Sequence, residues 1–176
     1  MINLFEALLS AVWYTAGAVL FFRMTPERIP GAEKLCRSKL LGIILTLPAA
    51  LQCVPLAIPV SPGFLLPWLL PAAVILPVLC WYFIDFYAAR GFALWMIVSA
   101  YGMIHTAFDH HIPGRQAVIV LLWLAGIAGM WISAKPYLLR DLFRKSAENR
   151  MIRGICAYSL LVLAVISLCI ALMIKI

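Results

Sequence analysis

Six long apolar stretches separated by short gaps constrain this chain more than any other feature. They cover residues 4–22, 40–58, 68–87, 91–108, 116–134 and 154–174. A helix needs roughly 20 mainly apolar residues to cross a bilayer, because each residue adds about 1.5 Å to its length. The sequence therefore predicts an all-α integral membrane protein with six transmembrane helices.

The composition excludes an ordinary soluble fold. Hydrophobic residues make up 65% of the chain and charged residues 12%, whereas soluble domains usually carry about 25% charged residues. Because the gaps are short, we expect one polytopic membrane domain over residues 1–176, without an appended soluble domain. We expect the first stretch to be retained and not cleaved as a signal peptide, because it contains Glu6 and no Lys or Arg precedes it.

The basic residues lie almost entirely in alternate gaps, and this asymmetry predicts an orientation. Gap 23–39 holds five of them, the predicted turn 88–90 holds Arg90, and gap 135–153 holds six, against two on the other side. Cytoplasmic loops of membrane proteins carry an excess of Lys and Arg. We therefore expect these three gaps to be cytoplasmic, both termini to lie outside, and the protein to reside in a bacterial-type inner membrane.

The same asymmetry accounts for the formal net charge of +7. Basic segments beside a bilayer are attracted to anionic lipid at the cytoplasmic face, so the bilayer itself is an expected partner. A nucleic-acid partner is not expected, because no basic patch with interleaved aromatic residues stands clear of the apolar stretches.

The second and third stretches form a proline-rich pair. Seven prolines fall within thirty residues of this pair: Pro48, Pro55, Pro59, Pro62, Pro67, Pro71 and Pro77. Each interior proline removes a backbone hydrogen bond and kinks its helix. One interpretation is a hairpin of kinked, tightly packed helices. The alternative is a broken-helix hairpin that lines a cavity, as in transporters.

Segment 135–153 has the pattern of an amphipathic helix on the membrane surface. Leu138, Leu139, Leu142 and Phe143 fall on one helical face. The alternative is a solvated charged linker. The residues expected to contact lipid head groups are Arg140, Arg144, Lys145, Arg150 and Arg153. On the fifth stretch, Ala125 and Gly129 form a pair of small residues typical of close helix packing.

A polar cluster closes the fourth stretch at its outer end. It comprises His105, Asp109, His110 and His111. Imidazole and carboxylate groups suit Zn or Cu, and His105 and Asp109 would share a helical face. One hypothesis is therefore a metal or proton-sensing site that faces outside. The plainer interpretation is a helix end with solvated polar side chains, and we predict no cofactor.

The middle of each predicted span holds no Asp, Glu, Lys, Arg or His, and Gln52 is the deepest strongly polar residue. No P-loop and no GxSxG motif occurs, and the five cysteines are scattered without CxxC spacing. We therefore expect a non-enzymatic subunit or accessory protein that works with a membrane-protein partner or as a homo-oligomer. The alternatives are a small-solute transporter or channel built on the proline-rich hairpin, and a metal-dependent membrane enzyme.

Overall fold

The computed structural model describes residues 4–109 and 114–175, and every regular element among them is helical. In chain order the elements are α1 (Leu4–Phe22), η1 (Pro26–Arg28), α2 (Ile29–Arg37), α3 (Lys39–Ala57), η2 (Ile58–Val60), η3 (Gly63–Leu65), α4 (Leu66–Phe83), α5 (Tyr87–Asp109), α6 (Arg115–Ala134), α7 (Tyr137–Glu148) and α8 (Arg150–Lys175). Within these residues, six segments are long and apolar enough to cross a membrane. This confirms the prediction of an all-α, multi-pass membrane protein.

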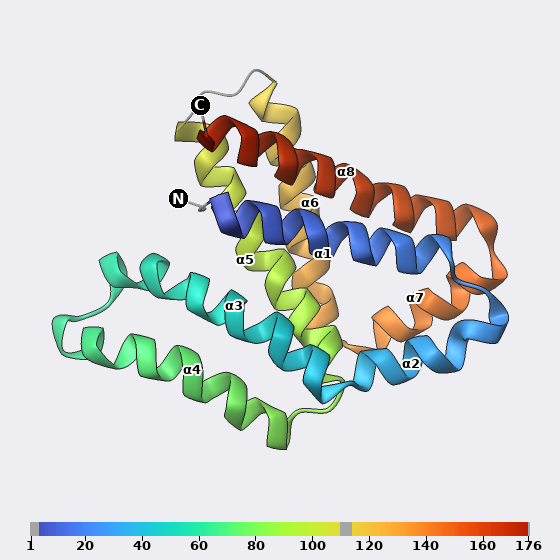
Figure 1. The fold of residues 1–176 in the computed structure, drawn as a ribbon, viewed down its shortest axis with the longest axis horizontal. Coiled ribbons are helices and arrows are strands. Elements are labelled where there is room, and N and C mark those ends of the chain that lie inside the picture. The colour runs from blue at the N-terminus through green and yellow to red at the C-terminus, as the bar shows by residue number, and fades with distance from the viewer. Residues whose placement is uncertain (1–3, 110–113, 176) are drawn as a thin grey trace.

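Helix α5 forms the centre of the bundle. It packs against α3 on one side and α6 on the other, and it also contacts α1, α2 and α8. Of its most apolar window, 61% is buried inside the protein, against 6% for the span that contains α4. Helices α1, α3, α6 and α8 are arranged around α5 (Figure 1).

Two helix pairs flank this centre. Helices α1 and α8 lie side by side and antiparallel over most of their length, although they are far apart in sequence (Figure 1). Helices α3 and α4 form an antiparallel hairpin whose second member, α4, packs mainly on α3. The hairpin thus packs against the bundle through α3, while α4 lies at the periphery.

Glycines allow the backbones to approach α5 closely. A Cβ atom at Gly129 of α6 would lie 2.9 Å from the Ala93 carbonyl oxygen, and one at Gly91 of α5 would lie 3.1 Å from the Gly42 carbonyl oxygen. Small residues at helix contacts are the usual means of tight packing in membranes. The small-residue pair predicted on the fifth stretch is confirmed as a contact, because Ala125 is also buried.

The turn between the third and fourth spans lies earlier than predicted. We expected it at residues 88–90, but α4 ends at Phe83 and α5 begins at Tyr87. Arg90 therefore lies in the first turn of α5. Within this short turn Phe86 adopts a left-handed conformation with φ 55°, and the Tyr87 side chain that follows is buried.

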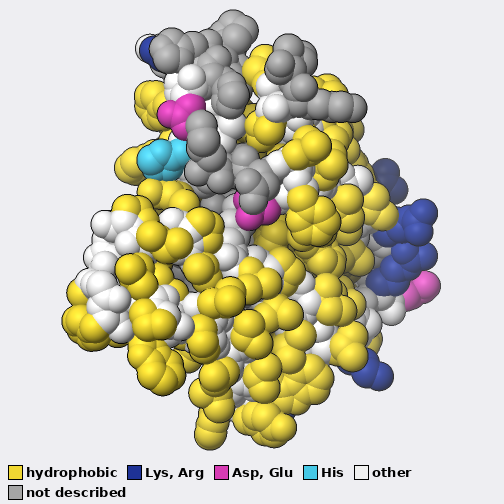
Figure 2. Space-filling model, turned by 60° about the vertical axis from the view of Figure 1, so that its left-hand side comes forward, with side chains coloured by type: hydrophobic (Ala, Val, Ile, Leu, Met, Phe, Trp, Pro, Cys, Tyr) yellow, Lys and Arg dark blue, Asp and Glu magenta, His cyan; other side chains and the backbone are white. Residues whose placement is uncertain are grey.

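Two short amphipathic helices lie together at one end of the bundle. Helix α2, in the first basic gap, packs beside α7 in the last one (Figure 1). Segment 135–153 is thus divided between α7 and the start of α8, which begins at Arg150, four residues before the predicted span. We call the end that carries α2, α7 and the α4–α5 turn the basic end. Figure 2 shows a largely hydrophobic face with most of its Lys and Arg side chains gathered at one edge.

Candidate functional site: an apolar cavity near the basic end

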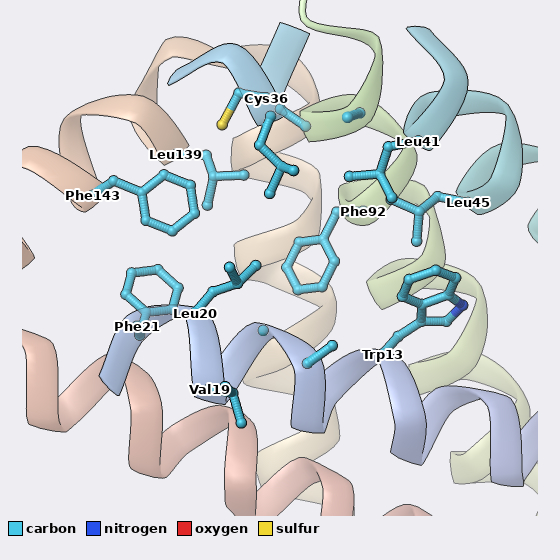
Figure 3. Close-up of a pocket in the computed structure, with 15 residues that line it drawn as sticks. Trp13, Val19, Leu20, Phe21, Cys36, Leu41, Leu45, Phe92, Leu139 and Phe143 are labelled. Carbon is cyan, nitrogen blue, oxygen red and sulfur yellow. The ribbon is translucent and has the colours of Figure 1, made fainter. Parts of the chain in front are cut away.

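An apolar cavity of about 460 Å³ lies between α1, α3 and α5 and is bounded at the basic end by α2 and α7. Figure 3 shows the labelled side chains, apart from Val19, converging on it from these five helices. The lining residues are Trp13, Ala16, Gly17, Val19, Leu20, Phe21, Leu35, Cys36, Leu41, Leu45, Ala88, Ala89, Phe92, Leu139 and Phe143. Its size falls in the range of about 300–1,000 Å³ that is usual for small-molecule sites.

Small residues on two helices leave this space empty. Ala16 and Gly17 contribute almost no side chain on α1, and Ala88 and Ala89 contribute little on α5. Both α1 and α3 pack on α5, so the gap between them remains. Of the α5 residues that line the cavity, Phe92 has the largest side chain (Figure 3).

The cavity opens sideways between α1 and α3. On α1, Ala16, Val19 and Leu20 line the cavity and are also exposed on the protein surface. Because the surrounding surface is apolar, this opening would face hydrocarbon in a bilayer. A molecule could therefore enter from the membrane without crossing the bundle.

Helices α2 and α7 close the cavity at the basic end. Phe143 of α7 packs on Phe21 of α1 with ring centroids 4.8 Å apart, and Leu139 is buried beside it. On the outer side, a guanidinium nitrogen of Arg144 pairs with a carboxylate oxygen of Glu33 at 2.5 Å, which links α7 to α2. The apolar face predicted for segment 135–153 thus contains residues that form a buried lid.

The cavity holds no side chain suited to acid–base or nucleophilic chemistry at neutral pH. Its thiol, Cys36, is 3% exposed. Burial, with a smaller contribution from nearby Glu33, raises the pKa of Cys36 to about 11, while Arg140 opposes the rise. Since the thiolate is the reactive form, Cys36 is an inert lining residue. The arrangement is suited to holding an apolar group.

A smaller, polar pocket of about 270 Å³ is lined by residues that lie close in sequence to those of the apolar cavity. Arg37 and Lys39 line it from the α2–α3 junction, and Ile84, Asp85 and Phe86 line it from the α4–α5 turn. The guanidinium carbon of Arg37 lies 5.0 Å from the centre of the Phe86 ring. This cation–π contact positions a cation at the edge of the pocket.

The described members of the predicted metal cluster, His105 and Asp109, lie at the other end of α5 from this site. His105 and Asp109 are exposed near the end of α5, and the His105 ring packs at a tilt against Tyr101 with centroids 4.5 Å apart. His110 and His111 lie outside the described residues. No group of three potential metal ligands occurs among the residues that the structure describes.

Three of the five residues predicted to contact lipid form side-chain ion pairs or hydrogen bonds within the described part of the protein. Arg140 pairs with Asp141 at 3.0 Å, Arg144 pairs with Glu33, and Arg153 donates a hydrogen bond of 2.8 Å to the Met24 carbonyl oxygen. Lys145 and Arg150 are exposed. All five lie at the basic end, and their contact with lipid stays a prediction.

A second cavity, of about 330 Å³, lies within the α3–α4 hairpin. Its lining is mainly apolar, from Ala50 and Val54 of α3 to Leu69 and Leu76 of α4, and Gln52 is not part of it. The Gln52 side chain is buried, and its Oε1 atom has no hydrogen-bond partner among the described residues. The polar cavity expected of a transporter hairpin thus does not coincide with this space.

The lining of the candidate site was not singled out by sequence reasoning, which treated its residues as ordinary span residues. One usable signal was present at the α2–α3 junction, where the amphipathic segment 29–37 meets an apolar span at Ser38. Comparisons with protein-family models, curated proteins and solved structures give no match to this chain. The functional argument therefore rests on the geometry of the site.

Proposed function

We propose that this chain is a small multi-pass inner-membrane protein that serves as a non-enzymatic subunit or accessory protein of a membrane assembly. In this proposal the basic end faces the cytoplasm and both termini lie outside, in accordance with the positive-inside rule. The partner is another membrane protein or a second copy of the chain.

The peripheral position of α4 is the observation that carries this proposal. The span that contains it is the least buried of the six, at 6%. Its surface includes Leu70, Val74 and Ile75, which are 59%, 44% and 53% exposed. Such a surface must be covered by lipid or by another helix. A hairpin that adds so little to the bundle is well suited to contact a partner.

The linings of the two apolar cavities described above agree with the non-enzymatic part of the proposal. Neither lining contains an Asp, Glu, His, Lys or Arg side chain. A transporter of polar solutes would instead be expected to use a polar cavity that reaches Gln52. Recognition of apolar surfaces therefore agrees better with the geometry than solute passage does.

Photocrosslinking in native membranes tests the proposal. A photoreactive amino acid placed at Leu70, Val74 or Ile75 of α4 should give a discrete adduct with a protein, either a second copy or another chain. Matched positions on α6 are Val120 and Leu124, both 58% exposed, and they should give only lipid adducts. Lipid adducts alone at all three α4 positions would contradict a partner on this helix.

A further inference from the structure

Neighbouring residues at the junction of α2 and α3 line the apolar cavity and the polar pocket. Leu35, Cys36 and Leu41 line the cavity, whereas Arg37 and Lys39, which lie between them in sequence, line the pocket. One short segment at the α2–α3 junction therefore contributes apolar side chains to the cavity and cationic side chains to the polar pocket.

The α4–α5 turn repeats this division. Asp85 and Phe86 line the polar pocket, and Ala88, Ala89 and Phe92 immediately follow and line the apolar cavity. The pocket holds two cations, Arg37 and Lys39, and one carboxylate, Asp85, so its formal charge is positive. An apolar cavity and a cationic pocket that are lined from the same two segments match an amphiphilic anion.

We propose that this pair of cavities binds one anionic phospholipid. An acyl chain enters the apolar cavity through the opening between α1 and α3, and the phosphate lies against Arg37 and Lys39. Charge-assisted hydrogen bonds from these two side chains hold the phosphate oxygens. The inference goes beyond the proposed function, because it requires no protein partner.

The shape of the site distinguishes a lipid chain from a helix. The opening lies on the apolar side of the bundle between α1 and α3, but α2 and α7 close the cavity at the basic end. A spanning helix of a partner or second copy would have to continue past this lid. An acyl chain ends inside the cavity and needs no exit.

The head group determines the selectivity of the site. A lipid tail is as apolar in the bilayer as in the cavity, so moving it between them gains little. The cations of the pocket therefore favour an anionic head group over a zwitterionic one. The site is distinct from general attraction to the basic surface, which Lys145 and Arg150 also provide.

Native mass spectrometry of the full chain tests this proposal. The delipidated protein is incubated with equal amounts of phosphatidylglycerol and phosphatidylcholine that carry the same acyl chains. We expect one retained phosphatidylglycerol per chain and a preference of about tenfold or more over phosphatidylcholine. Equal retention of the two lipids would overturn the proposal, as would a lipid-free dimer in which a second copy occupies the cavity.

Two charge variants separate the pocket from the basic surface. Arg37→Gln with Lys39→Gln should remove the preference for phosphatidylglycerol and leave phosphatidylcholine binding unchanged. Lys145→Gln with Arg150→Gln removes the same charge from exposed positions and should keep the preference. If both double variants lose it equally, general surface attraction explains the binding and the specific site is refuted.

A third variant tests the apolar cavity. Ala16→Phe fills the opening and should lower retention of both lipids, whereas Val12→Phe, on the same helix and outside the lining, should not. If Ala16→Phe is not monodisperse, Leu20→Trp at the same opening replaces it. Unchanged lipid retention in the folded opening variant would overturn the proposal. The α4 crosslinks test the protein partner separately, so either proposal can fail without the other.

Discussion

The hydroxyl of Tyr87 lies 2.6 Å from Oγ1 of Thr46, and this contact joins the start of α5 to α3. The same hydroxyl donates a 2.7 Å hydrogen bond to the Pro77 carbonyl oxygen of α4. One side chain thus connects three helices near the turn where α4 ends. Since Tyr87 is 2% exposed, no solvent replaces these bonds when they are lost.

We predict that Tyr87→Phe lowers the free energy of unfolding by about 1 kcal/mol, the size usual for polar contacts between membrane helices. Unfolding in mixed detergent micelles measures the change. Tyr82→Phe is the matched control, because Tyr82 is 73% exposed and should tolerate the change. Equal effects of the two substitutions would show that the Tyr87 bonds contribute nothing to stability.

Close packing at Gly42 leads to a second prediction. A Cβ atom there would overlap the Tyr87 ring and lie 3.0 Å from the Tyr87 carbonyl carbon. Gly42→Ala should therefore separate α3 from α5 and destabilise the protein by about 1–3 kcal/mol. Gly31→Ala is the control, because a Cβ atom there meets nothing within 4 Å. Thermal unfolding in detergent compares the two, and a tolerated Gly42→Ala would argue against this helix contact.

The proposed orientation predicts opposite labelling of the two ends. Lys34 on α2 and Gln116 on α6 are both exposed. Each is replaced by cysteine in a background without the five natural cysteines. In intact cells an impermeant thiol reagent should label Gln116→Cys and not Lys34→Cys, whereas inverted vesicles should show the reverse. Labelling of both from the same side would refute the orientation.

The buried thiol of Cys36 predicts slow, strongly pH-dependent alkylation. Burial raises its pKa from 9.0 to about 11, so its thiolate fraction near neutral pH is about 100-fold lower than for an ordinary cysteine. The rate with a small membrane-permeant reagent should keep rising through pH 9 toward pH 11. Because ionisation of Cys36 is disfavoured in the folded state, the free energy of unfolding should fall as the pH rises from about 9 to about 11.

An exposed cysteine provides the comparison. Lys34→Cys in a Cys36→Ala background should react faster at neutral pH and reach its plateau at a lower pH. If Cys36 and the introduced cysteine show the same pH profile, the thiol is not buried as described.

We predict that no metal ion binds tightly at the polar end of α5. Among the described residues of the predicted cluster, His105 is exposed and packs at a tilt against Tyr101. Elemental analysis of untagged protein, purified without chelators, should find no stoichiometric Zn or Cu. One equivalent of either metal, lost in His105→Ala, would contradict this prediction and indicate a site at the outer end of α5.

The six spans could be predicted from sequence because apolar length alone determines whether a helix can cross a bilayer. The turn after α4 could not be placed correctly, because Ile84 and Phe86 are as apolar as the residues before them. Hydropathy also missed α2 as a helix, since its nine residues are too few and too polar to resemble a span. The position of this turn depends on tertiary contacts of Tyr87, which hydropathy does not report.

The candidate site was less predictable than the fold. Its residues are alanines, leucines and phenylalanines that occur in any membrane helix. They form a cavity only because α1 and α3 pack on different parts of α5 and leave a gap between them. Similarly, the pattern of segment 135–153 predicted an apolar face, but which surface that face would cover depends on where α1 and α2 lie.

The pairing of α1 with α8 has a consequence for biogenesis. The ribosome makes α1 first, but the helix on which it mainly packs begins only at Arg150. At about 5–20 residues per second, that delay is roughly 6–26 s. During this time α1 must reside in the lipid or in the insertion machinery without its final neighbour. Assembly of this bundle is therefore completed only after translation has passed through α8.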